Sequence, residues 1–244
     1  MIAQQFNLDT IANNLANVNT TGFKHQRAEF EDLMYQTFKG STTDSAAVQL
    51  GLGSAFTASA SDFSSGTLQP TSNPLDLAIT GSGFFQVQKP DGSLAFTRDG
   101  SFKKDANGLL VTSDGYPIQP PITIPANATA VSISATGEVS ALVAGQNEMQ
   151  PIGQIQIAVF PNPAGLTRMG QNLYAAGGAS GDPQVSNPGA TGAGELKSGF
   201  LEGSNVQVVE EMVKMIMAQR SYEINSKAIQ TSDEMLSTIN NLKR

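Results

Sequence analysis

Apolar residues recur at helical spacing near both ends of the chain, and at each end they form only a narrow stripe. In residues 2–17 the stripe consists of Leu8, Ile11 and Leu15. Along residues 205–241 it is longer and runs on to Leu242; its members are Val206, Val209, Val213, Ile216, Ile224, Ala228, Thr231, Met235, Ile239 and Leu242. A stripe this narrow needs a partner along its length. The pattern therefore predicts two terminal helices that pair as a coiled-coil-like domain.

The C-terminal helix has a recognisable start and no Gly or Pro that would interrupt it. Ser204 and Gln207 have the spacing of a capping box, in which the two side chains satisfy backbone amides of the first turn. Residues 205–241 would form a rod of roughly 55 Å, since each residue adds about 1.5 Å. This is too long for a small β domain to cover, so we expect its stripe to require further partners.

The stripe of this helix departs from a strict heptad. The step from Ile216 to Ile224 is one residue too long, and Tyr222 and Ile229 begin a second apolar line. Such a drift lets one helix contact several neighbours in turn. The alternative is an ordinary long helix packed on its own domain.

The segment after the first helix changes character twice. The run Asn17–Gly22 favours a helix end. Helical spacing then returns in residues 27–38, which predicts a short second helix carrying Phe30, Leu33, Met34, Thr37 and Phe38. Residues 39–73 are dominated by Ser, Thr, Ala and Gly. Such a segment favours a long, extended connection.

Turn signals dominate the centre of the chain. The dipeptides Asp91-Gly92, Asp99-Gly100, Asn107-Gly108 and Asp114-Gly115 supply the positive φ of tight hairpin turns. The segments between them predict a β-meander of four strands, with further strands at 131–134, 138–143 and 154–160. Residues 161–199 are rich in Pro and Gly and read as loops.

These elements together predict an α+β fold with a mainly β body. We expect a terminal helical domain from residues 1–38 and 204–244, an extended linker over 39–73, and a β-meander or barrel-like domain over 74–203.

Composition excludes several classes of function. The net charge is -7 and no basic cluster exceeds Lys103–Lys104, which disfavours nucleic-acid binding. The absence of cysteine excludes disulfides and thiolate zinc sites, and the single histidine, His25, excludes any site that needs two imidazoles. No apolar run is long enough for a membrane span, and the N-terminus lacks the pattern of a cleavable signal peptide.

No constellation in the sequence points to catalysis, a cofactor or a metal. Gly81-Ser82-Gly83 begins like a dinucleotide-binding loop, but strand residues follow where a helix is needed. Residues 105–108 lack the later ligands of a calcium loop. His25 has no identifiable nucleophile or orienting acid, and Glu210-Glu211 is typical of a solvated helix start. We therefore expect a protein without enzymatic activity.

Three blocks of the chain resemble the bacterial flagellar rod and hook family. Residues 11–24 (IANNLANVNTTGFK) look like its N-terminal motif, residues 80–102 (TGSGFFQVQKPDGSLAFTRDGSF) like its central β segment, and residues 218–242 like its terminal helix. The blocks occur in the family's order. Within the family, residues 26–38 and 119–128 look most like the members that build the distal rod.

The resemblance implies a structural subunit that assembles with itself into a rigid tube. Its members leave the cell unfolded through the flagellar export apparatus without a cleaved signal, the terminal helices form an inner tube, and the β domain forms the outer shell. The distal rod spans the periplasm, transmits torque to the hook, and turns inside the peptidoglycan and outer-membrane rings. Proximal rod and hook subunits are then further partners. The family's first helix usually begins several residues before Met1, so we expect this chain to begin inside it.

The resemblance also implies which residues carry the assembly. In the terminal helices these are Leu8, Ile11, Asn13, Asn14, Leu15, Asn17, Val206, Val209, Val213, Ile216, Tyr222, Ile224, Asn225, Ile229, Met235 and Ile239. The family motif falls on Gly22, Phe23, Lys24, Gly81, Gly83, Phe84, Phe85, Asp99 and Gly100. Residues 40–66 occupy the place of an insertion associated with rod straightness. The alternatives are a hook or proximal rod subunit, a secreted coiled-coil adhesin, and an extracellular β-fold hydrolase.

Overall fold

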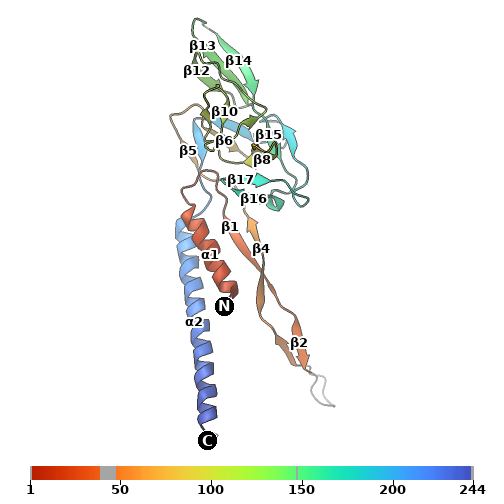
Figure 1. Ribbon diagram of the computed structural model, residues 1–244, viewed down its shortest axis with the longest axis vertical. Coiled ribbons are helices and arrows are strands. Elements are labelled where there is room, and N and C mark those ends of the chain that lie inside the picture. Colours follow the sequence, from red (N-terminus) through yellow and green to blue (C-terminus); the bar gives the residue numbers. More distant parts are fainter. Residues whose placement is uncertain (1, 39–47, 147, 243–244) are drawn as a thin grey trace. The chain divides into compact units, whose positions relative to one another are not determined.

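The computed structural model describes residues 2–38, 48–146 and 148–242, and it shows an α+β protein made mainly of strands (Figure 1). The chain divides into two compact units. Unit 1 contains residues 1–16, 26–62 and 207–244, and unit 2 contains residues 17–25 and 63–206.

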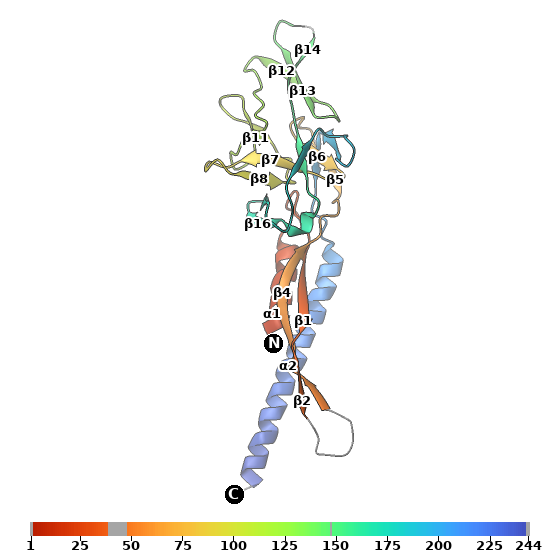
Figure 2. The ribbon, with the colours of Figure 1, turned by 90° about the vertical axis from the view of Figure 1, so that its right-hand side faces the viewer.

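Unit 1 consists of two helices and a long β-hairpin. The helices are α1 (Ile2–Ala16) and α2 (Val208–Leu242). The hairpin pairs β1 (Gln26–Asp32) with β4 (Ser54–Ser61), and further along the same two arms β2 (Tyr35–Phe38) with β3 (Val48–Gly51). Within this unit α1 lies beside the first part of α2 and also contacts β1 and β4 (Figures 1 and 2).

The helix predicted over residues 27–38 is wrong, because this segment forms β1 and β2. Its backbone pairs with residues 48–61, which the sequence suggested were part of a long, extended connection. Phe30 pairs directly with Phe56, so a cross-strand aromatic contact replaces the expected helical stripe. Much of the predicted linker is therefore paired strand, while residues 39–47 lie outside the described part of the chain.

The predicted limits of the terminal helices need one correction. The first helix ends at Ala16, as the turn signals from Asn17 indicate. The second begins at Val208, with the Gln207 carbonyl accepting the first helical bond from the Glu211 amide (3.0 Å). Ser204 lies too far ahead to cap this turn, and its hydroxyl accepts a bond from the Val206 amide instead (3.2 Å). The capping-box prediction is therefore wrong by about one helical turn.

Unit 2 is built around a seven-stranded antiparallel sheet. Its order is β16 (Thr167–Gly170), β17 (Leu173–Ala175), β8 (Leu94–Thr97), β7 (Phe84–Gln88), β15 (Ile157–Val159) and β18 (Gln184–Ser186), and β11 (Ile118–Gln119) also pairs with β7. A three-stranded sheet contains β12 (Ala128–Ile133), β13 (Glu138–Val143) and β14 (Met149–Gln154).

Smaller pairs complete this unit. They join β5 (Leu68–Pro70) to β20 (Phe200–Glu202), β6 (Leu77–Thr80) to β19 (Glu195–Ser198), and β9 (Lys103–Lys104) to β10 (Leu110–Val111). A short 3-10 helix covers Pro163–Gly165. The described strands do not close into a barrel. Residues 161–199, expected to be loops, contain four short strands.

The predicted meander is correct at three of its four turns. Gly92, Gly108 and Gly115 all have positive φ and close hydrogen-bonded turns. Asp99-Gly100 makes no hairpin, since β8 pairs with β7 and β17 and not with β9. Gly100 serves a close approach instead, because an added Cβ would lie 1.6 Å from the Leu77 carbonyl oxygen.

The core of unit 2 explains why its strands pair in this way. Phe85 and Phe102 meet edge to face at 5.0 Å, and they lie in a cluster of fully buried aliphatic residues that includes Leu77, Ile155 and Ile157. A second cluster on the other side of the sheet is aromatic and contains Phe84, Phe96, Phe160 and Tyr174. Burial on both faces fixes β7 as the centre of the sheet.

Candidate self-assembly surface and buried junction

The stripe of α1 faces the interior of unit 1, as its spacing predicts. Ile11 is 4% exposed, and Leu8 and Leu15 are half-buried. Asn13 lies on the exposed side of the same helix. Near its start, Phe6 stacks on Phe56 of β4 with the ring centroids 4.9 Å apart. The helix thus packs on α2 and on the hairpin at once.

The stripe of α2 lies on the solvent side. Six of its members are exposed, from 48% at Val213 to 75% at Val209; they are Val209, Val213, Ile216, Ile224, Met235 and Ile239. Tyr222 and Ile229 of the second apolar line are 40% and 51% exposed. Asn225 is exposed as well. The covered face of α2 carries Glu211 and Ala218 instead. Val206 is buried, but it precedes α2 and belongs to unit 2.

Asn14 joins three elements of unit 1. Its side-chain amide donates to the Gln26 carbonyl at the start of β1 (2.8 Å) and to the Glu211 carboxylate on α2 (3.0 Å). Its side-chain oxygen accepts from the Gln26 amide (2.9 Å). Glu211 also accepts from Lys214 Nζ at 2.7 Å. Because Asn14 is only 1% exposed, this polar link replaces apolar packing at the point where α1, β1 and α2 meet.

In unit 2, the N-terminal motif forms a tightly held loop. Gly22 has φ +67°, and a Cβ there would lie 2.6 Å from the Asp99 nitrogen, so only glycine fits. Thr21 Oγ1 donates to Asp99 Oδ1 at 2.9 Å. Phe23 is buried beneath the Arg168 guanidinium, which lies 5.0 Å from the ring centroid. Arg168 also donates to the Lys24 carbonyl.

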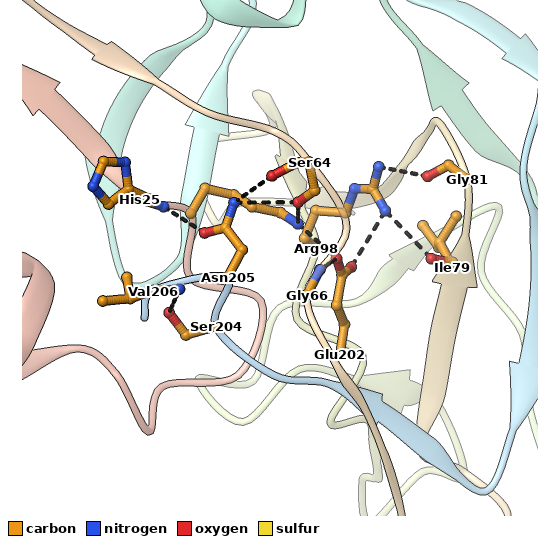
Figure 3. Close-up of polar contacts among 11 residues, drawn as sticks. His25, Ser64, Gly66, Ile79, Gly81, Arg98, Glu202, Ser204, Asn205 and Val206 are labelled. Carbon is orange, nitrogen blue, oxygen red and sulfur yellow. Dashed lines mark hydrogen bonds and ion pairs between the residues drawn. The ribbon is translucent and has the colours of Figure 1, made fainter. Parts of the chain in front are cut away.

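Glu202 is the centre of a buried charge cluster in the same unit. Its Oε1 accepts from Lys24 Nζ at 2.6 Å and from the Gly66 amide at 3.0 Å, and its Oε2 accepts from Arg98 Nη1 at 3.3 Å. The exposed fractions of Lys24, Arg98 and Glu202 are 0%, 3% and 1%. Burial lowers the pKa of Arg98, and the neighbouring Glu202 carboxylate partly opposes that shift. Figure 3 shows Glu202 between Arg98 and Gly66.

Two residues of the central motif, Gly81 and Phe84, contact Arg98 of this cluster. Arg98 Nη2 donates to the Gly81 carbonyl at 2.7 Å, and the guanidinium lies 5.2 Å from the centroid of the Phe84 ring. Gly83, with φ +141°, lets the chain pass Ile157, since a Cβ would lie 2.9 Å from its Cδ1. Phe85 belongs to the main core. Gly81 and Phe84 of the central motif and Lys24 of the N-terminal motif thus meet at the pair formed by Arg98 and Glu202.

The described residues contain no group of three or more His, Cys, Asp or Glu side chains that could hold a metal ion. The single histidine, His25, contributes a backbone contact to unit 2: its amide donates a hydrogen bond to Asn205 Oδ1 at 2.7 Å. Within the described ranges, no helix combines the length and apolar character that a membrane span requires.

Three family models match the chain, and relatives match it over nearly all of its length. The models are the flagella basal body rod protein (residues 1–24), the flagellar hook protein FlgE/F/G D1 domain (78–141) and the flagellar basal body rod FlgEFG protein C-terminal region (197–242). The flagellar basal-body rod protein FlgG of Borreliella burgdorferi is 51% identical, covering 100% of this chain and 96% of the relative. FlgG of Buchnera aphidicola subsp. Acyrthosiphon pisum is 49% identical (98% and 95%), and that of Bacillus subtilis 44% (98% and 94%).

The chain belongs to the flagellar basal-body rod protein family. This is a family of structural rod proteins, and the three matched segments correspond to the three blocks singled out in the sequence. The structure has two buried polar centres, the Asn14 link in unit 1 and the Glu202 cluster in unit 2, and each combines residues from different matched segments. Lys24, Arg98 and Glu202 come one from each of the three, and Asn14 and Glu211 come from the first and the last.

Sequence reasoning missed several residues of this rod protein that the structure shows to be central. Arg98, Glu202 and Asn205 each bond to segments far away in the chain, and so no local spacing reveals them. Glu202 did leave one signal, because it is a lone charge in the apolar and glycine-rich run 199–203 (GFLEG). A single acid in such a run is typical of a buried, paired carboxylate.

Proposed function

We propose that this chain is the structural subunit of the distal segment of the flagellar basal-body rod, where many copies assemble into a rigid helical tube that transmits torque to the hook. The observation that carries the proposal is full-length similarity to basal-body rod proteins, combined with an α2 whose apolar stripe is exposed.

The geometry of unit 1 supports self-assembly through the terminal helices. With 35 residues against 15, α2 is about 50 Å long and α1 about 22 Å. One copy of α1 can therefore cover less than half of α2. The exposed stripe needs helices of other copies, and head-to-tail contacts that do not close produce a filament. In this proposal the helices pack in a coiled-coil-like inner tube through the residues of the two stripes.

Unit 2 is the outer shell in this arrangement. Its partners there are the peptidoglycan-ring and outer-membrane-ring proteins, while proximal rod and hook subunits lie at the two ends of the segment. The chain reaches this place, across the periplasm, through the flagellar export apparatus and without a cleaved signal. A polar shell of low charge suits a shaft that turns inside a ring, since 14% of residues are charged.

The hairpin of unit 1 suggests how the rod stays straight. Residues 40–66, which occupy the place of the straightness insertion, include β3 and β4. Their side chains Leu50 and Leu52 are 55% and 58% exposed, so the arm can pack on a neighbouring copy and oppose sliding between copies.

Deleting 40–66 should give curved, hook-like rods. A shorter deletion of residues 39–51 keeps the β1–β4 pairing and tests the arm alone. Straight rods from both deletions would refute this role.

Electron microscopy of basal bodies tests the main proposal. In a strain that lacks its own distal rod gene, the basal bodies should end in a short proximal rod. Expression of this chain in that strain should restore a full rod and hook. A variant with Ile224→Asn and Ile239→Asn, both exposed on α2, should fold as a monomer but restore nothing. Gln230→Asn, at an exposed position of the same helix outside the assembly residues, is the matched polar control. Restored rods in the double variant would show that the stripe is not the assembly surface.

A further inference from the structure

The chain passes between the two units at four places, and all four lie at the ends of three segments of unit 2. These segments are residues 17–25, the stretch that begins at Phe63, and the stretch that ends at Val206. Wherever the chain crosses between unit 2 and unit 1, the residue on the unit 2 side therefore belongs to one of these three segments. The contacts among them lie inside unit 2.

Side-chain bonds tie the three segments together. Lys24 Nζ donates to the Ser64 carbonyl at 2.8 Å, and Asn205 Nδ2 donates to the Ser64 hydroxyl at 2.9 Å. The Asn205 side-chain oxygen accepts from the His25 amide at 2.7 Å. Figure 3 shows Asn205 between His25 and Ser64. Each segment is thus bonded to both of the others.

Glu202 connects this set to the sheet. Its carboxylate holds Lys24, the Gly66 amide and Arg98 of the segment after β8, and its backbone carbonyl accepts from the Gly22 amide at 2.8 Å. The backbones are also packed closely, because a Cβ on Gly66 would lie 1.9 Å from the Gly203 carbonyl oxygen. The Glu202 carboxylate, which belongs to the third segment, therefore has partners on the other two segments and on the residue that follows β8.

We propose that Glu202 is the hub of a lock that orders the three exit segments together, and only once residues from both ends of the chain have met. Buried cations are costly without their counter-ion. Before Glu202 arrives, Lys24 and Arg98 cannot pack in this dry site, and residues 17–25 stay undocked. The lock is a property of the single chain. Its role in preparing the terminal helices for assembly rests on the proposed function.

Hydrogen exchange of the soluble full-length chain, with Glu202→Gln as the variant, tests the lock. The substitution removes the negative charge and one of the two acceptor oxygens, so it weakens the side-chain bonds to Lys24, Arg98 and the Gly66 amide, whereas the amides of Gly22 and His25 keep their acceptors. A lock predicts that all three exchange faster by the same factor, on the order of tenfold or more. The amides of β7 and β8 should keep their protection. Glu195→Gln, an exposed acid of the same unit, should exchange like the wild type.

The outcomes separate a lock from a local contact. Faster exchange at Gly66 alone, or unequal factors at the three amides, would overturn the proposal. If Glu202→Gln does not fold, Asn205→Ala provides the second test, since it removes a link without removing the buried carboxylate. It removes the acceptor of the His25 amide directly, so Gly22 and Gly66 are the reporters here. Exchange at these two amides should rise together by a smaller factor, and unchanged exchange at both would overturn the lock. Rod restoration in cells is a separate readout, so a chain that shows the lock but builds no rod refutes only the proposed function.

Discussion

Replacing Asn14 by alanine removes the side chain that joins α1, β1 and α2. The variant loses two bonds to the Gln26 backbone, of 2.8 and 2.9 Å, and one bond of 3.0 Å to the Glu211 carboxylate. All of these groups meet at a site where Asn14 is 1% exposed. Water therefore cannot replace the lost partners without opening the contact between the two helices.

The expected cost follows from the kind of bond that is lost. A neutral hydrogen bond contributes about 1 kcal/mol and a bond to a charged group about 1.5–3 kcal/mol. Two of the first kind and one of the second give about 3–5 kcal/mol of destabilisation in unit 1. This is a large share of the ~5–15 kcal/mol that holds a typical domain together.

Circular dichroism in urea measures this effect, because both α-helices of the described chain belong to unit 1 and the helical signal reports on that unit. With a slope of about 2 kcal/mol per molar urea, the midpoint should fall by roughly 1.5–2.5 M. Gln5→Ala, on the exposed side of α1, should leave it unchanged.

Asn14→Asp sharpens the test, because it places a carboxylate where the amide now meets Glu211. This variant should be less stable at pH 8 than at pH 5, since two nearby carboxylates repel each other when both are charged. An Asn14→Ala midpoint within about 0.3 M of the wild type, or a pH-independent Asn14→Asp, would refute the argument.

Three further changes test unit 2. Gly22→Ala should lower the free energy of unfolding of unit 2 by about 2–4 kcal/mol, because the new Cβ would lie 2.6 Å from the Asp99 nitrogen in a conformation with positive φ. Urea unfolding measures this loss. A loss below about 1 kcal/mol would contradict the packing argument. Phe85→Ala should cost about 3–5 kcal/mol and lower the melting temperature, whereas Leu94→Ala at a half-exposed position should cost far less, and equal losses would count against the assigned core. Burial raises the pKa of Tyr174 above its ordinary value of 10.0, so stability that is present below pH 10 should be lost as the pH rises through the higher folded-state value; Tyr174→Phe should remove that part of the pH dependence, and an identical alkaline loss in both proteins would refute it.

The sequence predicted the elements whose signal is local. Helix α1, most of α2 and the turns at Gly92, Gly108 and Gly115 depend on residues that are neighbours in the chain, and the structure has them. It failed where pairing is long-range. Residues 27–38 have helical spacing, yet they form strands because residues 48–61 supply a ladder that a Ser- and Ala-rich composition does not reveal.

The candidate self-assembly surface shows the same difference between local signals, which the sequence reveals, and long-range contacts, which it does not. The spacing of residues in α2 predicts an apolar line, but spacing alone cannot show that Glu211 and Ala218 form the face covered within unit 1. A partner inside the chain and a partner in another copy produce the same periodicity. Only the exposed fractions of the side chains distinguish these two cases.

Both polar centres pair residues near the two ends of the chain. Asn14 meets Glu211 in unit 1, and Lys24 meets Glu202 in unit 2. Apolar contacts tolerate shifts in register, but buried hydrogen-bonded charges do not, because each misplaced group keeps its desolvation cost. The two ends can therefore combine in only one register within each unit. In unit 1 this specification comes from Asn14 and Glu211, since the drifting apolar stripe of α2 lies on the solvent side and cannot set the register of α1 on α2.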